Sequence, residues 1–237
     1  MYQDSQRSQS AYVARPMAQV SSQLLTQAFF WMFAGLLLTA FIAFLVENNL
    51  KLAQSAAQLW IVLILGEMGL AIGIQAAIRK ISAGTALLLF LVYAALNGVT
   101  FGVIVLAYSL NGQSATVVQA FLSAAAMFGG AAMYGLVTKR NLASMFGILA
   151  MATWGLIVAI LLNFLFQSST LDLLISVAGV VIYAFLTAST TQKIQRGDFA
   201  FITGSTEKAA VWGALLLYLE FVSIFIFMLR LFGGGRR

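Results

Sequence analysis

The chain has 237 residues, of which 62% are hydrophobic and only 8% are charged, with 13 Lys and Arg against 7 Asp and Glu. Soluble domains carry about 25% charged residues, so this deficit indicates a membrane protein, and we expect the positive charge to reflect membrane topology rather than nucleic-acid binding. The absence of Cys excludes disulfides and thiolate chemistry, and the absence of His removes the commonest general base and the commonest transition-metal ligand.

The predicted elements are seven long apolar helices. Residues 1–22 form a polar N-terminal tail that does not read as a cleavable signal, and residues 23–237 are expected to form one all-α transmembrane domain. About 20 apolar helical residues cross a ~30 Å hydrocarbon core. Segments of this kind lie at 27–46, 58–78, 84–108, 117–138, 145–166, 171–193 and 209–232. The longest connection, QKIQRGDFAFITGSTEK, is too short for a soluble domain.

The distribution of Lys and Arg predicts a cytoplasmic N-terminus, because basic residues concentrate in cytoplasmic loops. With that orientation Lys51, Arg236 and Arg237 lie outside and Arg230 lies within the last helix. The inside set is Arg7, Arg15, Arg79, Lys80, Lys139, Arg140, Lys193, Arg196 and Lys208. An odd number of helices places the GGGRR tail outside, and a re-entrant last segment is the alternative that would place it inside.

Small residues predict close contacts between helices, which packing in lipid favours. Gly66, Gly69 and Gly73 line one side of the second segment, and Ala131 and Gly135 form a small-xxx-small pair in the fourth. We expect these stripes to serve packing.

Polar residues also recur on single helix faces. Tyr93, Asn97 and Thr100 share one face of the third segment because they are four and three residues apart. Similar stripes are Ser176, Gly179, Tyr183, Thr187 and Thr190 in the sixth segment, and Gly213, Glu220 and Ser223 in the seventh. Two interpretations stay open: hydrogen bonds between helices, worth ~0.6 kcal/mol each, or a polar pathway through the membrane.

Two acids lie deep in the predicted membrane region. Glu67 and Glu220 are each twelve residues from a flanking basic residue, Arg79 and Lys208 respectively, and therefore ~18 Å into the membrane. Hydrocarbon favours the uncharged form of a carboxyl group, so both are candidates for groups that change charge with pH, and intramembrane acids are functional candidates in general. The alternative is a neutral acid that hydrogen-bonds Asn97 or a backbone carbonyl.

The sequence offers no catalytic machinery. A Ser-His protease would need a His, and a retinal protein would need a Lys in the middle of a helix, whereas the Lys residues here lie in loops or at helix ends. There is no GxxxxGK[ST] motif and no cluster of metal ligands. We therefore expect neither an enzyme nor a bound cofactor.

Five stretches resemble the Bax-inhibitor-one family, also called transmembrane Bax inhibitor motif proteins, and more narrowly its bacterial inner-membrane branch. They are FWMFAGLLLTAF (30–41), RKISAG (79–84), MYGLVTKRNLASM (133–145), LTASTTQKI (186–194) and LLLYLEFVSIFIFMLRLFG (215–233). The resemblance implies seven helices around a central last helix. It also implies a pH-sensitive calcium leak and, in some members, modulation of other membrane proteins or of cell-death signalling.

Two positions depart from the family pattern. The family carries a pair of acids that is thought to share a proton and open with pH; here Thr190 stands at the first acid position and Glu220 at the second. Arg230 stands at the family's basic position, and Asn141 stands where an Asp is usual.

The loss of one acid leaves two functional hypotheses. The first is a leak for calcium or protons, in which Glu220 is the pH gate and the calcium ligand. The other residues expected along this pathway are Thr190, Glu67, Arg230 and Asn97. Glu67 and Glu220 would then form a substitute acidic site. A single glutamate is a poor calcium site, because hard cations favour several anionic oxygens. The alternative is a non-conducting regulator that binds another membrane protein, such as a protease or channel.

Overall fold

A computed structural model describes residues 2–234, with side-chain environments from residue 22 onward except at residue 146. Within this range the chain is helical and without strands. The long helices are α1 (Tyr2–Glu47), α3 (Trp60–Ala77), α4 (Ala83–Leu110), α5 (Ser114–Val137), α6 (Phe146–Phe166), α7 (Ser169–Arg196) and α9 (Thr206–Gly233). Short elements are α2 (Leu50–Gln58), η1 (Leu142–Met145) and α8 (Asp198–Thr203).

The seven predicted spans are confirmed: seven helices of the described chain are long and apolar enough to cross a membrane. The apolar part of the first is Ser22–Glu47, and α1 continues it towards the N-terminus as one helix through the polar tail. Helices form because only intrahelical hydrogen bonds satisfy the backbone in hydrocarbon. The re-entrant alternative for the last segment is wrong, because α9 is one continuous helix of 28 residues.

Side-chain caps define where several helices begin. Ser82, Ser168 and Ser205 accept hydrogen bonds from the backbone N–H groups three residues later and so start α4, α7 and α9. Gly197 and Gly204 adopt positive φ angles of 77° and 68° and bound the short helix α8. The predicted connection 192–208 is therefore largely helical: it contains the end of α7, all of α8 and the start of α9.

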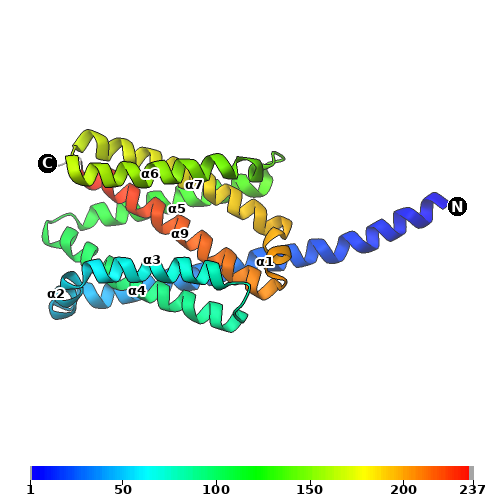
Figure 1. The fold of residues 1–237 in the computed structure, drawn as a ribbon, viewed down its shortest axis with the longest axis horizontal. Helices are drawn as coiled ribbons and strands as arrows, with labels where there is room; N and C mark the ends of the chain where they lie inside the picture. Colours follow the sequence, from blue (N-terminus) through cyan, green and yellow to red (C-terminus); the bar gives the residue numbers. More distant parts are fainter. Residues whose placement is uncertain (1, 235–237) are drawn as a thin grey trace.

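Helix α9 lies in the centre of the bundle, as the family resemblance implies. It crosses between α3 and α4 on one side and α6 and α7 on the other (Figure 1), and it packs against α1, α4, α5, α7 and α8. It is the most buried of the seven spans. Tyr218, Leu215, Leu217 and Ile224 are among its fully buried side chains. Any polar side chain on α9 is thus held away from lipid by neighbouring helices.

Glycines mark where helices approach most closely, and here one prediction is wrong. Gly66, Gly69 and Gly73 of α3 are exposed, and a Cβ added at any of them would meet no other atom within 4 Å. The close contacts occur elsewhere: Gly98 and Gly102 of α4 lie against α1, and Gly135 of α5 lies against the backbone of Ala188 in α7. The α3 stripe has the right spacing, but α3 turns that face away from the bundle.

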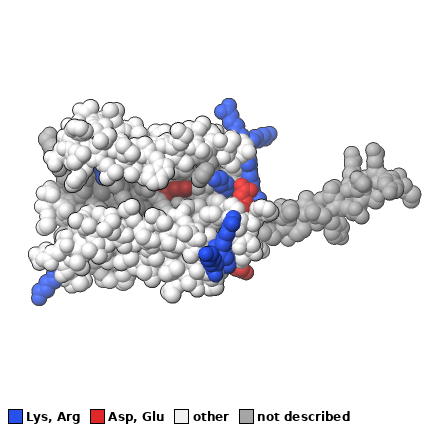
Figure 2. Space-filling view, in the orientation of Figure 1, with Lys and Arg blue, Asp and Glu red and all other residues white. Residues whose placement is uncertain are grey.

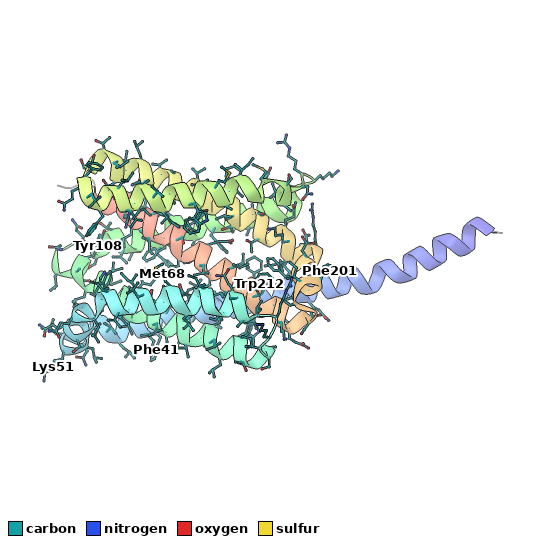
Figure 3. All side chains as sticks on the ribbon, viewed as in Figure 1. Phe41, Lys51, Met68, Tyr108, Phe201 and Trp212 are labelled. Carbon is teal, nitrogen blue, oxygen red and sulfur yellow. The ribbon has the colours of Figure 1, made fainter. Side chains whose placement is uncertain are left out.

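The charged side chains are unevenly placed. Most of the Lys and Arg side chains lie at the end of the bundle from which α1 extends, and a hollow between the two groups of helices shows an acidic side chain within it (Figure 2). Lys51 and Tyr108 lie towards the opposite end from Phe201 and Trp212 (Figure 3). The bundle therefore has one strongly basic end.

Candidate functional site

Glu220 lies at the contact between α9 and α7. Its side chain is only 6% exposed, and its Oε1 accepts a hydrogen bond of 2.5 Å from the hydroxyl of Thr190. Its Oε2 is buried and has no hydrogen-bond partner among the described residues. The two helices meet closely here because Gly179 of α7 fits against Phe227 and Gly213 of α9 against Ile194. The sequence-predicted pair of Thr190 and Glu220 is therefore brought together.

Further polar groups of the α7 stripe continue along the same contact. Thr187, one turn before Thr190, donates a hydrogen bond of 2.9 Å to the carbonyl oxygen of Tyr183 and interacts with the carboxyl group of Glu220. Tyr183, one turn earlier still, interacts with Ser223 of α9. Lys193, one turn beyond Thr190, interacts electrostatically with Glu220. Ser176, Thr187 and Thr190 are all buried. The predicted stripe thus faces α9, and the contact between α7 and α9 is lined by hydroxyl groups around one carboxyl group.

Glu67 occupies a second polar cluster, between α3 and α4. Its Oε1 accepts a hydrogen bond of 2.5 Å from the hydroxyl of Thr100, and the side chain is only partly buried. Tyr93 and Asn97, on the same face of α4, interact with each other, and Glu67 acts electrostatically on Tyr93. The amide nitrogen of Asn97 is buried without a partner in the described chain. The predicted α4 stripe therefore faces Glu67 and the bundle interior.

Tyr218 connects this second cluster to the central helix. Its hydroxyl lies 2.6 Å from that of Thr39 in α1, which also donates to the carbonyl oxygen of Ala94 in α4. Its ring packs edge-on against those of Phe90 and Tyr93. Sequence reasoning missed Thr39 and Tyr218, because nothing in an apolar run shows which helix a tyrosine faces.

The two glutamates belong to clusters on different sides of α9: Glu220 points from α9 towards Thr190 of α7, whereas Tyr218 points towards the cluster of Glu67 between α3 and α4. Tyr218, which belongs to the Glu67 side, and Glu220 are two residues apart and so point about 200° apart around the helix. No hydrogen bond or ion pair joins the two carboxyl groups within the described range, and no group of three or more Asp or Glu there could hold a metal ion. Each glutamate instead accepts a hydrogen bond from a different threonine, Thr100 or Thr190. The substitute acidic site of Glu67 and Glu220 stays a prediction.

Arg230 lies at the far end of α9 from the basic end of the bundle. Its guanidinium lies 3.7 Å from the carboxylate of Asp172 at the start of α7, and both side chains are more than a third exposed. Nearby, Tyr108 of α4 donates a hydrogen bond of 3.4 Å to the carbonyl oxygen of Leu229. The sequence allowed a pairing of Arg230 with Glu67; the ion pair that the structure shows is with Asp172, a residue that sequence reasoning did not single out.

Gln192 is a further residue that sequence reasoning passed over, two positions after Thr190. Its amide oxygen accepts from the backbone N–H of Leu142 at 2.9 Å, and its amide nitrogen donates to the carbonyl oxygens of Arg140 at 2.8 Å and Thr138 at 3.4 Å. Gln192 is 3% exposed. It therefore fastens the α5–α6 loop to α7 close to the Glu220 site. In the sequence, the one indication of this role was the presence of a glutamine in the TTQKI stretch.

Comparison with known proteins supports the resemblance found in the sequence. The family described as inhibitor of apoptosis-promoting Bax1 matches residues 21–237. The inner membrane protein YbhL of Escherichia coli K12 is 35% identical over 230 residues, covering 94% of this chain and 96% of that protein. An uncharacterized protein of Deinococcus radiodurans is 39% identical over 213 residues, covering 90% of each chain. One of Borreliella burgdorferi is 36% identical over 223 residues, covering 92% of this chain and 94% of that protein.

The family match extends over all seven spans and includes both helices of the Glu220–Thr190 contact. The chain is an integral membrane protein and belongs to the Bax inhibitor-1 family.

Proposed function

We propose that the protein is a pH-sensitive cation leak pathway, with calcium or protons as the permeant ions and Glu220 with Thr190 as its gate. The observation that carries the proposal is the buried carboxyl oxygen of Glu220, which has no partner in the described chain. A buried polar atom without a partner is costly, and such atoms concentrate where a ligand, an ion or a proton is handled. It lies on the central helix of the bundle, about midway along its length.

The chemistry of the site sets its expected strength. Thr190 donates a hydrogen bond to Glu220 but carries no charge, so it neither repels the carboxylate nor shares a proton with it as a second acid would. One carboxylate surrounded by hydroxyl groups also gives a hard divalent cation few anionic oxygens. We therefore propose a weaker calcium leak, with a flatter pH dependence, than a pair of acids would give.

The other predicted residues receive roles by their place in the bundle. Glu67 and Asn97, in the polar cluster between α3 and α4, would form a second polar site along the pathway, and Arg230, paired with Asp172, would lie at its far end. The proposal involves no catalytic step and no cofactor.

The proposed setting is a bacterial inner membrane with the N-terminus on the cytoplasmic side. The gathering of Lys and Arg at one end of the bundle supports this orientation. The relative YbhL, which is described as an inner membrane protein, supports the location.

The test is reconstitution into liposomes loaded with a calcium indicator, read from pH 6 to 8. Wild type is compared with Glu220→Gln, with Thr190→Asp and, as the same acid-to-amide change at the second polar cluster of the proposed pathway, with Glu67→Gln. We expect a leak that falls about tenfold in Glu220→Gln, because a midplane carboxylate changes the energy of a nearby cation by more than 1.4 kcal/mol. We expect a larger and more pH-dependent leak in Thr190→Asp. A leak that Glu220→Gln leaves unchanged contradicts the proposal.

A second candidate function, a non-conducting regulator that binds another membrane protein, is favoured by one observation. The exposed glycine face of α3, made of Gly66, Gly69 and Gly73, has no neighbour within 4 Å among the described residues and has the spacing at which transmembrane helices approach each other. Absence of leak in wild type, together with a membrane partner that co-purifies with wild type and is lost in Gly69→Leu, would favour this function over the first.

A further inference from the structure

The loop between α5 and α6 and the end of α7 form a compact basic surface. Lys139 and Arg140 are exposed on the loop, and Arg196 is exposed in the last turn of α7. Arg196 donates a hydrogen bond of 2.7 Å from Nη1 to the side-chain oxygen of Asn141. Three cationic side chains are thereby carried on two short segments that touch each other.

The surface is held in place by buried contacts beneath it. Gln192 bonds to the backbone of Thr138, Arg140 and Leu142, so the loop backbone faces inward while the basic side chains face outward. Asn141 additionally accepts from the backbone N–H of Ala143 at 3.2 Å. A site whose backbone is fixed in advance loses less entropy when it binds a ligand.

None of these three cations forms an ion pair with an acid among the side chains that the structure describes. The ion pair between Arg230 and Asp172 lies at the opposite end of the bundle (Figure 1). Two described acids at the basic end interact with other groups: Glu207 accepts a hydrogen bond from Ser205 at 2.7 Å, and Asp198 interacts with Lys193. Arg196 itself meets a neutral amide where a carboxylate would have cancelled its charge.

The surface begins where the lipid-facing surface ends. Val137, the last residue of α5, is 74% exposed, and Met133 one turn earlier is 67% exposed, as expected for side chains in contact with lipid tails. On the neighbouring helix α6, Ile148 and Met151 are 66% and 76% exposed. The basic loop follows Val137 directly, so it lies at the level of the lipid headgroups, at the basic end of the bundle (Figure 2).

We propose that Lys139, Arg140 and Arg196 form a binding site for the headgroup of an anionic phospholipid whose tails lie along α5 and α6. The charge of the site, its lack of acidic partners and its place at the edge of the apolar surface each favour this ligand over a soluble anion. Basic residues at the membrane surface attract anionic headgroups, and arginine pairs with phosphate in a bidentate manner.

The experiment measures lipid binding by the full-length purified protein. Native mass spectrometry counts phosphatidylglycerol and phosphatidylcholine molecules retained from matched detergent–lipid mixtures, and thermal unfolding is followed in the same mixtures. We expect wild type to retain phosphatidylglycerol preferentially. Asn141→Asp should weaken this binding about fivefold, because it neutralises one positive charge, and Lys139→Gln with Arg140→Gln should weaken it further.

Three controls make the result decisive. Asn141→Ser keeps an oxygen for Arg196 without adding charge and should bind as wild type does. Lys51→Gln, at the other end of the bundle, should also leave phosphatidylglycerol binding unchanged. Unfolding temperatures in phosphatidylcholine identify any variant that fails to fold.

Three outcomes overturn the proposal. The first is equal retention of the two lipids, and the second is equal phosphatidylglycerol binding by wild type and Asn141→Asp. The third is displacement of the lipid by millimolar inorganic phosphate, which would make this a site for soluble anions.

Discussion

The two glutamates of the membrane region have the same predicted depth, yet their surroundings in the structure differ. Glu220 is buried between α7 and the central helix, with one oxygen bonded to Thr190 and the other unpartnered in the described chain. Glu67 belongs to α3, a helix at the edge of the bundle, and bonds to Thr100 while partly exposed. Depth in the membrane alone therefore does not define a buried site; the position of the helix within the bundle does.

The glycines differ in the same way, because some face the bundle and others face outward. Substitution of a glycine that faces the bundle is expected to cause the largest loss of stability. Gly135→Leu should destabilise the protein by about 3 kcal/mol, because the side chain would collide with the backbone of Ala188. Gly69→Leu should be neutral, since nothing lies within 4 Å of its added Cβ. Thermal unfolding in detergent measures both. Equal destabilisation would show that the α3 face is packed as tightly as the α5–α7 contact.

Removing each threonine hydroxyl tests the two acids directly. Thr190→Val should cost about 2 kcal/mol, because it leaves a buried carboxyl group without a hydrogen bond on either oxygen. Thr100→Val should cost less than about 1 kcal/mol, because the carboxyl group of Glu67 is only partly buried and its loss of one hydrogen bond is less costly than at a fully buried group. The measurement is again thermal unfolding. A larger loss in Thr100→Val than in Thr190→Val would reverse our ranking of the two sites.

Removing the hydrogen bonds that hold the α5–α6 loop against α7 should cause an intermediate loss of stability. Gln192→Ala removes three hydrogen bonds to the loop and should cost about 1–2 kcal/mol, with faster hydrogen exchange at Leu142. Gln195→Ala is the matched control, because that glutamine is exposed one turn further along α7. If exchange at Leu142 is the same in both variants, Gln192 does not fasten the loop.

The smallest effect is expected at the far end of the bundle. Asp172→Asn removes the charge facing Arg230 and should change stability by less than about 1 kcal/mol, since both partners are more than a third exposed. The difference from wild type should shrink further in high salt. A salt-independent loss of several kcal/mol would mean that this pair, rather than the Glu220 contact, holds α7 against α9.

Sequence reasoning predicted much of this architecture and some of the site. The seven spans agree with the structure to within a few residues for most boundaries, apart from the start of the first, and Thr190 does meet Glu220. The α2 and α8 helices, the Asp172–Arg230 pair and the three bonds of Gln192 were not predicted. Each depends on which residues become neighbours across the bundle, and the pattern of a single segment does not contain that information.

The pattern of the amino-acid sequence was enough to predict seven membrane-spanning helices and a gathering of basic residues at one end, and it predicts equal depths for the two acids. These properties follow from the transfer of local segments into lipid and from the rise of a helix. The outward orientation of the α3 glycines, and the separation of Glu220 at the α7–α9 contact from Glu67 between α3 and α4, are seen in the folded bundle alone. In lipid, side chains facing the bundle and side chains facing the membrane are both apolar, so hydropathy does not fix the rotation of a helix; contacts between helices do.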